Sequence, residues 1–356
     1  MTPPVATHIW LNGRLVPSDV AHLSAYDRGF QLGDGVFEAL RARRGVPIEL
    51  EGHLARLHAG MAVLAMDLPF GDEAIAAGIS ELLAAEGWDG VEPWATSAEP
   101  GAAPAEPGAE PGAATDAEPG TGAAEPRATV APGTPIPGDA VIRITVSRGF
   151  DPTRGVSPHP GGITTVAIQA WPFSPPTART LNEGRRFVTS VVRRDADSPI
   201  AGIKTTSRAE LVYAHLEAER AGADDAIFMT TDGRITEATT SNVLVIRSDE
   251  CATPRLGTGL LAGTTRAWLV EHGEAAGLRM VQRDIPLAEA FGADELAVCA
   301  SIGGVVPVTV LDGRAIGDGR PGPRTIALRR ARESWIDRIS IEGARARLAA
   351  AGATPR

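Results

Sequence analysis

A segment between residues 91 and 138 divides the chain into two parts and limits how it can fold. The four-residue unit Ala-Glu-Pro-Gly recurs there at 98–101, 105–108, 109–112 and 117–120. The segment has almost no large apolar side chains, so burial cannot offset the entropy that its backbone would lose on folding. We predict a disordered insertion rather than a partner-binding tract, because it has no PxxP series with flanking basic residues. The rest of the chain, about 308 residues, suits two domains.

Charge and composition exclude several classes of function. The formal net charge is −10, and most of the excess acid lies in or beside the insertion. An acidic chain without a Lys/Arg block lacks the electrostatic footprint of nucleic-acid-binding proteins, and no apolar run reaches the roughly 18 residues of a membrane span. Two cysteines, seven histidines without an HExxH-type pair and no evident secretory signal favour a cytoplasmic protein without a metal site.

Strand and helix patterns mix on both sides of the insertion. Hairpins are predicted around residues 12–13 and 44–45, and helices over 53–66, 207–222 and 264–277. Runs typical of strands lie at 140–149, 163–173, 185–192, 224–230, 241–246, 278–285 and 295–300. Because the elements do not alternate strictly as βαβ units, we predict an α+β or mixed α/β fold in two domains.

The two prolines in SPPTA mark the expected boundary between these domains, since proline interrupts helices and strand ladders. We place a smaller N-terminal α/β domain at 1–173, a connector at 174–180 and a larger C-terminal domain at 181–325. Residues 326–356 form a basic tail with a helical pattern, which we interpret as a docking helix or a frayed one.

Lys204 is the first candidate for chemistry. In SPIAGIKTTSRAE it follows an apolar stretch and precedes a Thr-Thr-Ser sequence that is typical of a helix cap. An amine held at such a junction loses solvation, which lowers its pKa as a Schiff-base lysine requires. On its own the pattern is far more typical of a solvated surface lysine.

Other residues add to this candidate. Glu237 follows a strand and a turn in DGRITEATTSN, so it is either a surface acid or a partner for a protonated pyridine nitrogen. Arg56 lies on the predicted helix in HLARLH, where it could bind a phosphate or extend from the apolar face into solvent. Thr264 and Thr265 lie at a helix N-terminus, which is an ordinary cap or an anion site.

Eight short motifs follow one another along nearly the whole chain outside the insertion and the tail. They are NGRLVP, DRGFQLGDGVFEALR, HLARL, SRG, GIK, DGRITEATTSN, LLAGTTR and VCASIGGVVPV. In this order they resemble the class-IV (fold-type IV) pyridoxal-phosphate enzymes, the family of branched-chain and D-amino acid transaminases and of aminodeoxychorismate lyase. The resemblance implies a two-domain α/β enzyme of the D-amino acid aminotransferase-like fold. It also implies a homodimer with the site near the interface, which DRGFQLGDG helps to build.

The resemblance assigns roles to the candidate residues. It implies that Lys204 binds pyridoxal 5'-phosphate covalently and then shuttles protons. Glu237 would pair with the pyridine nitrogen, and Arg56 would hold the phosphate together with Thr264 and Thr265. The substrate would be a small amine or amino acid.

The resemblance leaves two reactions open. SRGFDPTRGVSP and NEG followed by IAGIK resemble aminodeoxychorismate lyase, and Arg208 stands where several transaminases have tyrosine. VFEALR instead resembles the transaminases, although their Tyr-x-Arg-Pro segment is missing. Arg148 and Arg154 are candidate anchors for substrate carboxylates in either reaction.

On balance we predict a lyase that converts 4-amino-4-deoxychorismate to 4-aminobenzoate and pyruvate in folate biosynthesis. The alternative is an amino acid transaminase, for branched-chain or D-amino acids, that uses a 2-oxo acid acceptor.

Overall fold

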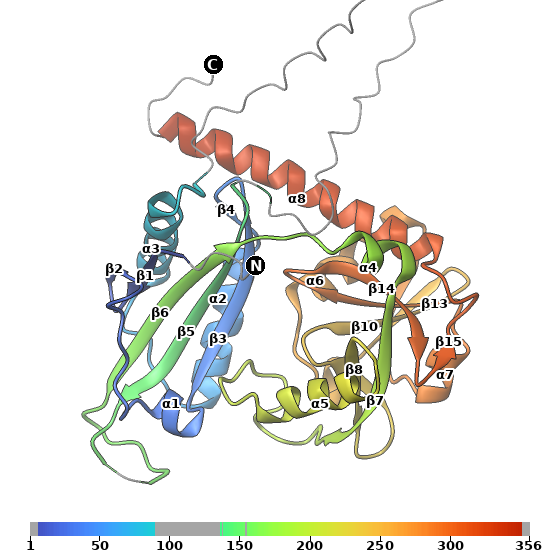
Figure 1. The fold of residues 1–356 in the computed structure, drawn as a ribbon, viewed down its shortest axis with the longest axis horizontal. Helices are drawn as coiled ribbons and strands as arrows, with labels where there is room; N and C mark the ends of the chain where they lie inside the picture. Colours follow the sequence, from blue (N-terminus) through green and yellow to red (C-terminus); the bar gives the residue numbers. More distant parts are fainter. Residues whose placement is uncertain (1–5, 90–135, 137, 154, 351–356) are drawn as a thin grey trace, which may run out of the picture.

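The computed structural model describes residues 6–89, 136, 138–153 and 155–350. The insertion predicted at 91–138 lies outside these residues except for Ile136 and Gly138, and so does Arg154. The described residues form a mixed α/β fold with one sheet on each side of the molecule (Figure 1). We call residues 6–173 the N-terminal unit and residues 181–322 the C-terminal unit. The mixed α/β fold class predicted from the sequence is confirmed.

The N-terminal unit is an antiparallel sheet with two helices packed on one face. In the described residues the strand order is β2-β1-β6-β5-β3-β4. The strands are β1 (His8–Leu11), β2 (Arg14–Pro17), β3 (Gly35–Arg43), β4 (Val46–Pro47), β5 (Ala140–Phe150) and β6 (Ile163–Pro172). The helices are the short α1 (Arg28–Leu32), α2 (Leu50–Val63) and α3 (Asp72–Ala85). Apolar side chains of α2 and α3 share one core with the sheet, so β3 and α2 are held rigidly against each other.

Both predicted hairpins of this unit are confirmed, and each has a two-residue turn with positive φ. Asn12 and Gly13 have φ of 48° and 87°, and Arg44 and Gly45 have φ of 51° and 68°. This geometry matches the twist of the flanking strands. A Cβ on Gly45 would lie 2.3 Å from the carbonyl oxygen of Asp89. Helix α3 was not predicted from the sequence.

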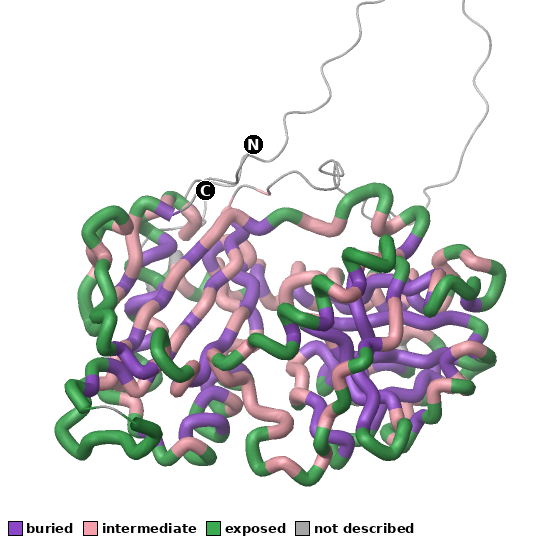
Figure 2. The backbone as a smooth tube through the Cα atoms, turned by 60° about the horizontal axis from the view of Figure 1, so that its bottom comes forward, coloured by how far each residue is buried: buried purple, intermediate pink, exposed green. Residues whose placement is uncertain are grey.

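The C-terminal unit is built on a mixed sheet. In the described residues its strand order is β12-β11-β10-β13-β14-β7-β8-β9, with β15 paired to β14. The strands are β7 (Arg185–Arg194), β8 (Asp225–Thr230), β9 (Ile235–Ala238), β10 (Asn242–Arg247), β11 (Glu250–Pro254), β12 (Arg279–Arg283), β13 (Glu295–Ala300), β14 (Gly304–Leu311) and β15 (Arg314–Ala315). The helices are α5 (Ala209–Arg220), α6 (Thr264–His272) and α7 (Leu287–Phe291), with 3-10 turns at Leu256–Thr258 and Gly273–Ala276. Most of its strands are buried along their length, as Figure 2 shows.

Two helices lie outside this division. Helix α4 (Ala178–Glu183) begins inside the predicted connector, and its N-cap Thr177 directly follows the two prolines. Helix α8 (Pro323–Ala350) is 28 residues long and runs across one end of both units (Figure 1). Leu328 and Ile336 of α8 are buried, so this helix is docked along part of its length. Within the described residues, no helix is both long enough and apolar enough to cross a membrane.

Candidate active site

A cavity of about 980 Å³ lies where the two units meet. Residues of both units line it, and they include Phe37, Arg56, Arg143, Lys204, Arg208, Glu237, Ser241 and Thr265. Five of the eight residues proposed from the sequence are therefore in one cavity, and Thr264 directly precedes one of them. Among the described residues, no three His, Cys, Asp or Glu side chains gather as a metal site.

Lys204 lies on a loop of the C-terminal unit that is bonded to a strand of the N-terminal unit. Its carbonyl oxygen accepts a 2.9 Å hydrogen bond from the Phe37 amide, and Thr206 donates to the Gly35 carbonyl oxygen at 2.9 Å. The side chain is half-buried. Burial, and next the positive charge of Arg56, lower the pKa of the Lys204 amine from 10.5 to about 8. Lys204 therefore has an uncharged amine for part of the time near neutral pH.

Glu38 lies behind the cavity lining and holds Arg56, which lines the cavity on the side of the N-terminal unit; we call this group the Glu38 wall. Its carboxylate is fully buried and accepts two 2.7 Å bonds from Arg56, through Nε and Nη2. Nδ1 of the buried His53 lies 2.7 Å from the same carboxylate. Burial opposes ionisation, but the hydrogen bonds from Arg56 and His53 lower the pKa of Glu38 to about 2. The Phe-Glu pair in VFEALR was the only sequence signal for Glu38, and no role was predicted for it.

Glu237 itself lines the cavity on the side of the C-terminal unit, and we call it and its partners the Glu237 wall. It lies on β9 and is 8% exposed. One carboxylate oxygen accepts a 3.2 Å bond from Arg194 Nη2, and the other accepts a 3.0 Å bond from the Leu261 amide. Burial raises the pKa of Glu237, although the nearby charge of Arg194 acts in the opposite direction. Arg194 was not predicted from the sequence.

The segment just before α6 is hydrogen-bonded to both walls. Arg56 Nη1 donates a 2.7 Å bond to the Ala262 carbonyl oxygen, just before this helix begins. Thr265 is 1% exposed, and its hydroxyl has no hydrogen-bond partner among the described residues. The Ser241 hydroxyl is also buried without a described partner, and both residues line the cavity. Unpartnered hydroxyls, free helix N–H groups and an arginine are the donors that a phosphate group requires.

Two arginines surround Phe37 beside Lys204. The guanidinium of Arg143 lies 3.7 Å from the centre of the Phe37 ring, and that of Arg208 lies 5.3 Å from it. Lys204 Nζ lies 4.9 Å from the same ring centre. Burial lowers the pKa of both arginines, and for Arg143 the charge of Arg208 adds to this effect. Arg143, which was not proposed from the sequence, forms no ion pair with a described residue.

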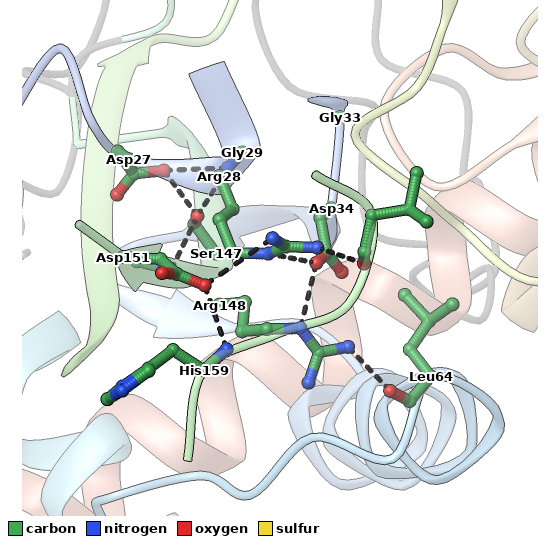
Figure 3. Close-up of polar contacts among 12 residues, drawn as sticks. Asp27, Arg28, Gly29, Gly33, Asp34, Leu64, Ser147, Arg148, Asp151 and His159 are labelled. Carbon is green, nitrogen blue, oxygen red and sulfur yellow. Dashed lines mark hydrogen bonds and ion pairs between the residues drawn. The ribbon is translucent and has the colours of Figure 1, made fainter. Parts of the chain in front are cut away.

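Arg148 does not line this cavity. Its Nε donates a 2.8 Å bond to Asp34, and Nη2 donates a 2.6 Å bond to the Leu64 carbonyl oxygen (Figure 3). Arg28 of the DRGFQLGDG motif donates to Asp34 as well, at 2.8 Å. The arrangement links α1, β5 and the end of α2 within the N-terminal unit. In this chain the Arg148 guanidinium is thus engaged by its own unit, and the Arg154 candidate lies outside the described residues.

The family model described as amino-transferase class IV matches residues 35–128 and 124–311. The chain belongs to the class IV aminotransferases. Enzymes of this class use pyridoxal phosphate, so the chain is a pyridoxal-phosphate-dependent enzyme, as predicted. The buried donors at the start of α6, Glu237 and the Lys204 amine fit this cofactor.

Three curated proteins show the range of its relatives. A putative branched-chain-amino-acid aminotransferase of Methanocaldococcus jannaschii is 26% identical over 90% of this chain and 93% of its own. D-alanine aminotransferase of Bacillus licheniformis is 26% identical over 89% of this chain and 93% of its own. Aminodeoxychorismate lyase of Vibrio harveyi is 25% identical over 84% of this chain and 90% of its own.

Solved structures agree on the fold. The branched-chain amino acid aminotransferase of Escherichia coli superposes with a TM-score of 0.75 at 20% identity, covering 92% of this chain and 94% of that one. The branched-chain aminotransferase of Thermoproteus uzoniensis, solved with norvaline, superposes with a TM-score of 0.71 at 22% identity, covering 94% and 95%.

Among these relatives, the curated proteins favour the aminotransferase alternative over the lyase that we predicted first. Of the segments that pointed to the lyase, SRGFDPTRGVSP begins at the end of β5 and NEG lies at the end of α4, and neither supplies a described residue to the lining of the cavity.

Proposed function

We propose that the protein is an amino acid aminotransferase that transfers the amino group to a 2-oxo acid. The observation that carries the proposal is the position of the Lys204 amine, with its pKa near 8, in a cavity lined by Arg56, Glu237 and Thr265. Lys204 would form the covalent link to pyridoxal phosphate, Arg56 and Thr265 would bind its phosphate, and Glu237 would pair with its ring nitrogen. The cofactor supplies an electron sink that stabilises negative charge on the substrate carbon bearing the amine.

Each residue then has a defined task. Arg56, the Thr265 hydroxyl and the first amides of α6 bind the phosphate. Glu237, whose pKa burial raises, shares a proton with the ring nitrogen. With pyridoxal phosphate bound, Lys204 Nζ would take the proton from the substrate carbon that bears the amine and would deliver it to the cofactor atom C4′. An amine with a pKa near the working pH can both accept and donate a proton.

Arg143 and Arg208 are the proposed carboxylate anchors for the substrate. Both guanidiniums and the Lys204 amine lie close to the Phe37 ring. Two desolvated arginines that form no ion pair with a described carboxylate would gain charge-assisted hydrogen bonds from a substrate carboxylate. Arg208 is also the observation that favours the second candidate, the lyase, since the sequence associates it with that enzyme.

The test is a single-turnover experiment with the purified holoenzyme. We expect L-leucine, L-isoleucine or D-alanine to convert the bound cofactor to pyridoxamine phosphate and to release one 2-oxo acid. The Lys204→Ala variant should do neither. Formation of pyruvate and 4-aminobenzoate from 4-amino-4-deoxychorismate, without any reaction of the amino acids, would overturn the proposal in favour of the lyase.

The proposal includes two domains bounded as predicted from the sequence, a cytoplasmic location and a homodimer. Apolar side chains support the homodimer, since Tyr26 and Phe30, beside and within α1, are 58% and 78% exposed. Large exposed apolar side chains that lie together mark interaction surfaces. Light scattering during gel filtration should give twice the mass of the chain.

A further inference from the structure

Arg332 of α8 is a fully buried arginine that does not line the cavity. It is 1% exposed. Its guanidinium packs against two neighbouring indole rings, 5.1 Å from the centre of Trp268 and 4.6 Å from that of Trp335, and these two centres are themselves 5.6 Å apart. It also forms a two-pronged ion pair with Glu49, in which Nη1 donates to Oε1 at 3.2 Å and Nη2 donates to Oε2. The two indole rings and the Glu49 carboxylate together restrict how this guanidinium can be oriented.

Glu49 connects this guanidinium to α2. It is the residue before the helix, and it has a left-handed backbone with φ of 56°. A non-glycine residue in this conformation needs support from its surroundings. The Glu49 side chain forms no cap with α2 itself, so its described ion pair with Arg332 supplies that support. Helix α2 carries His53 and Arg56, and the His53 amide donates to the Glu49 carbonyl oxygen at 3.1 Å.

Trp268 connects the same guanidinium to α6. It lies four residues, about one helical turn, after Thr264. Its indole also stacks on His272, with ring centres 4.7 Å apart. Arg332 therefore contacts both helices that meet at the proposed phosphate site, α2 through the residue before it and α6 through Trp268.

We propose that Arg332 is a positioning residue for cofactor retention, because it fixes α2 relative to α6 across the boundary between the two units. It touches neither the cavity nor the substrate. Its effect passes through the spacing between Arg56 on α2 and the first residues of α6, and a phosphate bound by both helices is sensitive to that spacing. This inference rests on the proposed role of Arg56 and Thr265 in binding the phosphate.

The same helix offers a matched control. Glu333 of α8 accepts bonds from Arg41 at 3.0 Å and from Arg43 at 3.4 Å. Both arginines lie on β3, so this contact also joins α8 to the N-terminal unit but does not involve α2 or α6. If α8 only holds the two units together, loss of either contact should change cofactor release by the same factor.

The experiment measures the release of pyridoxal phosphate from the holoenzyme after dilution, by loss of the absorbance of the bound cofactor. We expect release to be about tenfold faster in Arg332→Met and in Glu49→Gln than in the parent, and within about twofold of it in Glu333→Gln. The double variant Arg332→Met/Glu49→Gln should release no faster than either single variant, because the two residues act through one contact. The 31P chemical shift of the bound phosphate should change in the first two variants only.

Two results would overturn the proposal. One is equal release rates in Arg332→Met, Glu333→Gln and the parent. The other is an unchanged rate in Glu49→Gln, which also covers the case in which Arg332→Met does not fold. Arg56→Ala separates this failure from failure of the phosphate assignment. If Arg56→Ala releases the cofactor faster but Arg332→Met and Glu49→Gln do not, only the role of Arg332 is wrong. If Arg56→Ala does not change the release rate, the phosphate assignment itself is wrong.

Discussion

Glu38 in the N-terminal unit and Glu237 in the C-terminal unit are both buried carboxylates, and each is paired with an arginine. Their pKa values nevertheless move in opposite directions. Glu38 receives three charged or polar donor atoms from Arg56 and His53, and its pKa falls to about 2. Glu237 receives one bond from Arg194 and one from a backbone amide, and burial raises its pKa.

The difference shows that burial alone does not decide what a carboxylate does. The donors around Glu38 outweigh its loss of hydration, so it is a permanent anion that holds two side chains in place. Glu237 receives fewer hydrogen bonds to offset its loss of hydration, so its carboxyl group binds a proton more readily than that of Glu38. One wall of the cavity is thus built for rigidity and the other for proton chemistry.

The largest expected effect comes from removing the charge of Glu237. In Glu237→Gln the amide cannot hold a proton on the ring nitrogen, so the single-turnover rate with an amino acid should fall about a thousandfold. Bound cofactor, measured by absorbance, should stay near that of the parent, because the phosphate site is intact. Stopped-flow formation of pyridoxamine phosphate gives the rate.

Glu217→Gln is the control for this variant. Glu217 accepts a 2.7 Å bond from Ser190 and lies outside the cavity lining, so its loss should leave the rate within about threefold of the parent. If the single-turnover rate of Glu237→Gln is also within about threefold of the parent, Glu237 takes no part in the proton chemistry, and the proposed difference between the two walls is wrong.

The second effect concerns stability and comes from Glu38. Its pKa is lowered from 4.5 to about 2, so its ionised form stabilises the fold above pH ~4.5, and this contribution is lost as the pH falls toward 2. The shift corresponds to about 3 kcal/mol, or roughly a hundredfold in the folding equilibrium. Urea unfolding of Glu38→Gln should show this loss at pH 7 and a shrinking difference from the parent below pH ~4.5. A difference that is the same at every pH would contradict the electrostatic explanation.

Local signals predicted much of the fold and missed parts that depend on packing. The turns at Asn12-Gly13 and Arg44-Gly45 were predictable, because two residues with positive φ leave a sequence signature. Helix α3 was missed between the first helix and the insertion, although its residues 75, 79, 82 and 83 are buried at helical spacing. The pairing of β14 with β7 in parallel joins segments more than 100 residues apart, and no local pattern encodes such a contact.

The site divides in the same way. Lys204, Glu237 and Arg56 were found because each follows a recognisable local motif, and they line one cavity. Arg143 was missed because its strand reads as an ordinary β-branched run, and only the structure brings it over Phe37. Arg148 was chosen for its neighbouring glycine, yet its guanidinium is bonded to Asp34 and the end of α2. Sequence alone identifies an arginine but not the partner that occupies it.

The smallest expected effect is a pH dependence at Lys204, which lines the same cavity. Burial and Arg56 lower the pKa of its amine to about 8, while Glu38 and, to a lesser degree, Glu237 act to raise it. Only the uncharged amine can join the cofactor, so the rate at which apoenzyme captures pyridoxal phosphate should rise about fivefold from pH 7 to pH 8 and level off above pH ~9. A lysine with an ordinary pKa would instead gain about tenfold per pH unit up to pH ~10.

Because Glu38 raises this pKa more than Glu237 does, the midpoint of the capture profile should move to lower pH in Glu38→Gln and by less in Glu237→Gln. Equal shifts of the midpoint in the two variants would mean that Glu38 and Glu237 affect the pKa of Lys204 to the same extent, which would contradict the proposed difference between them.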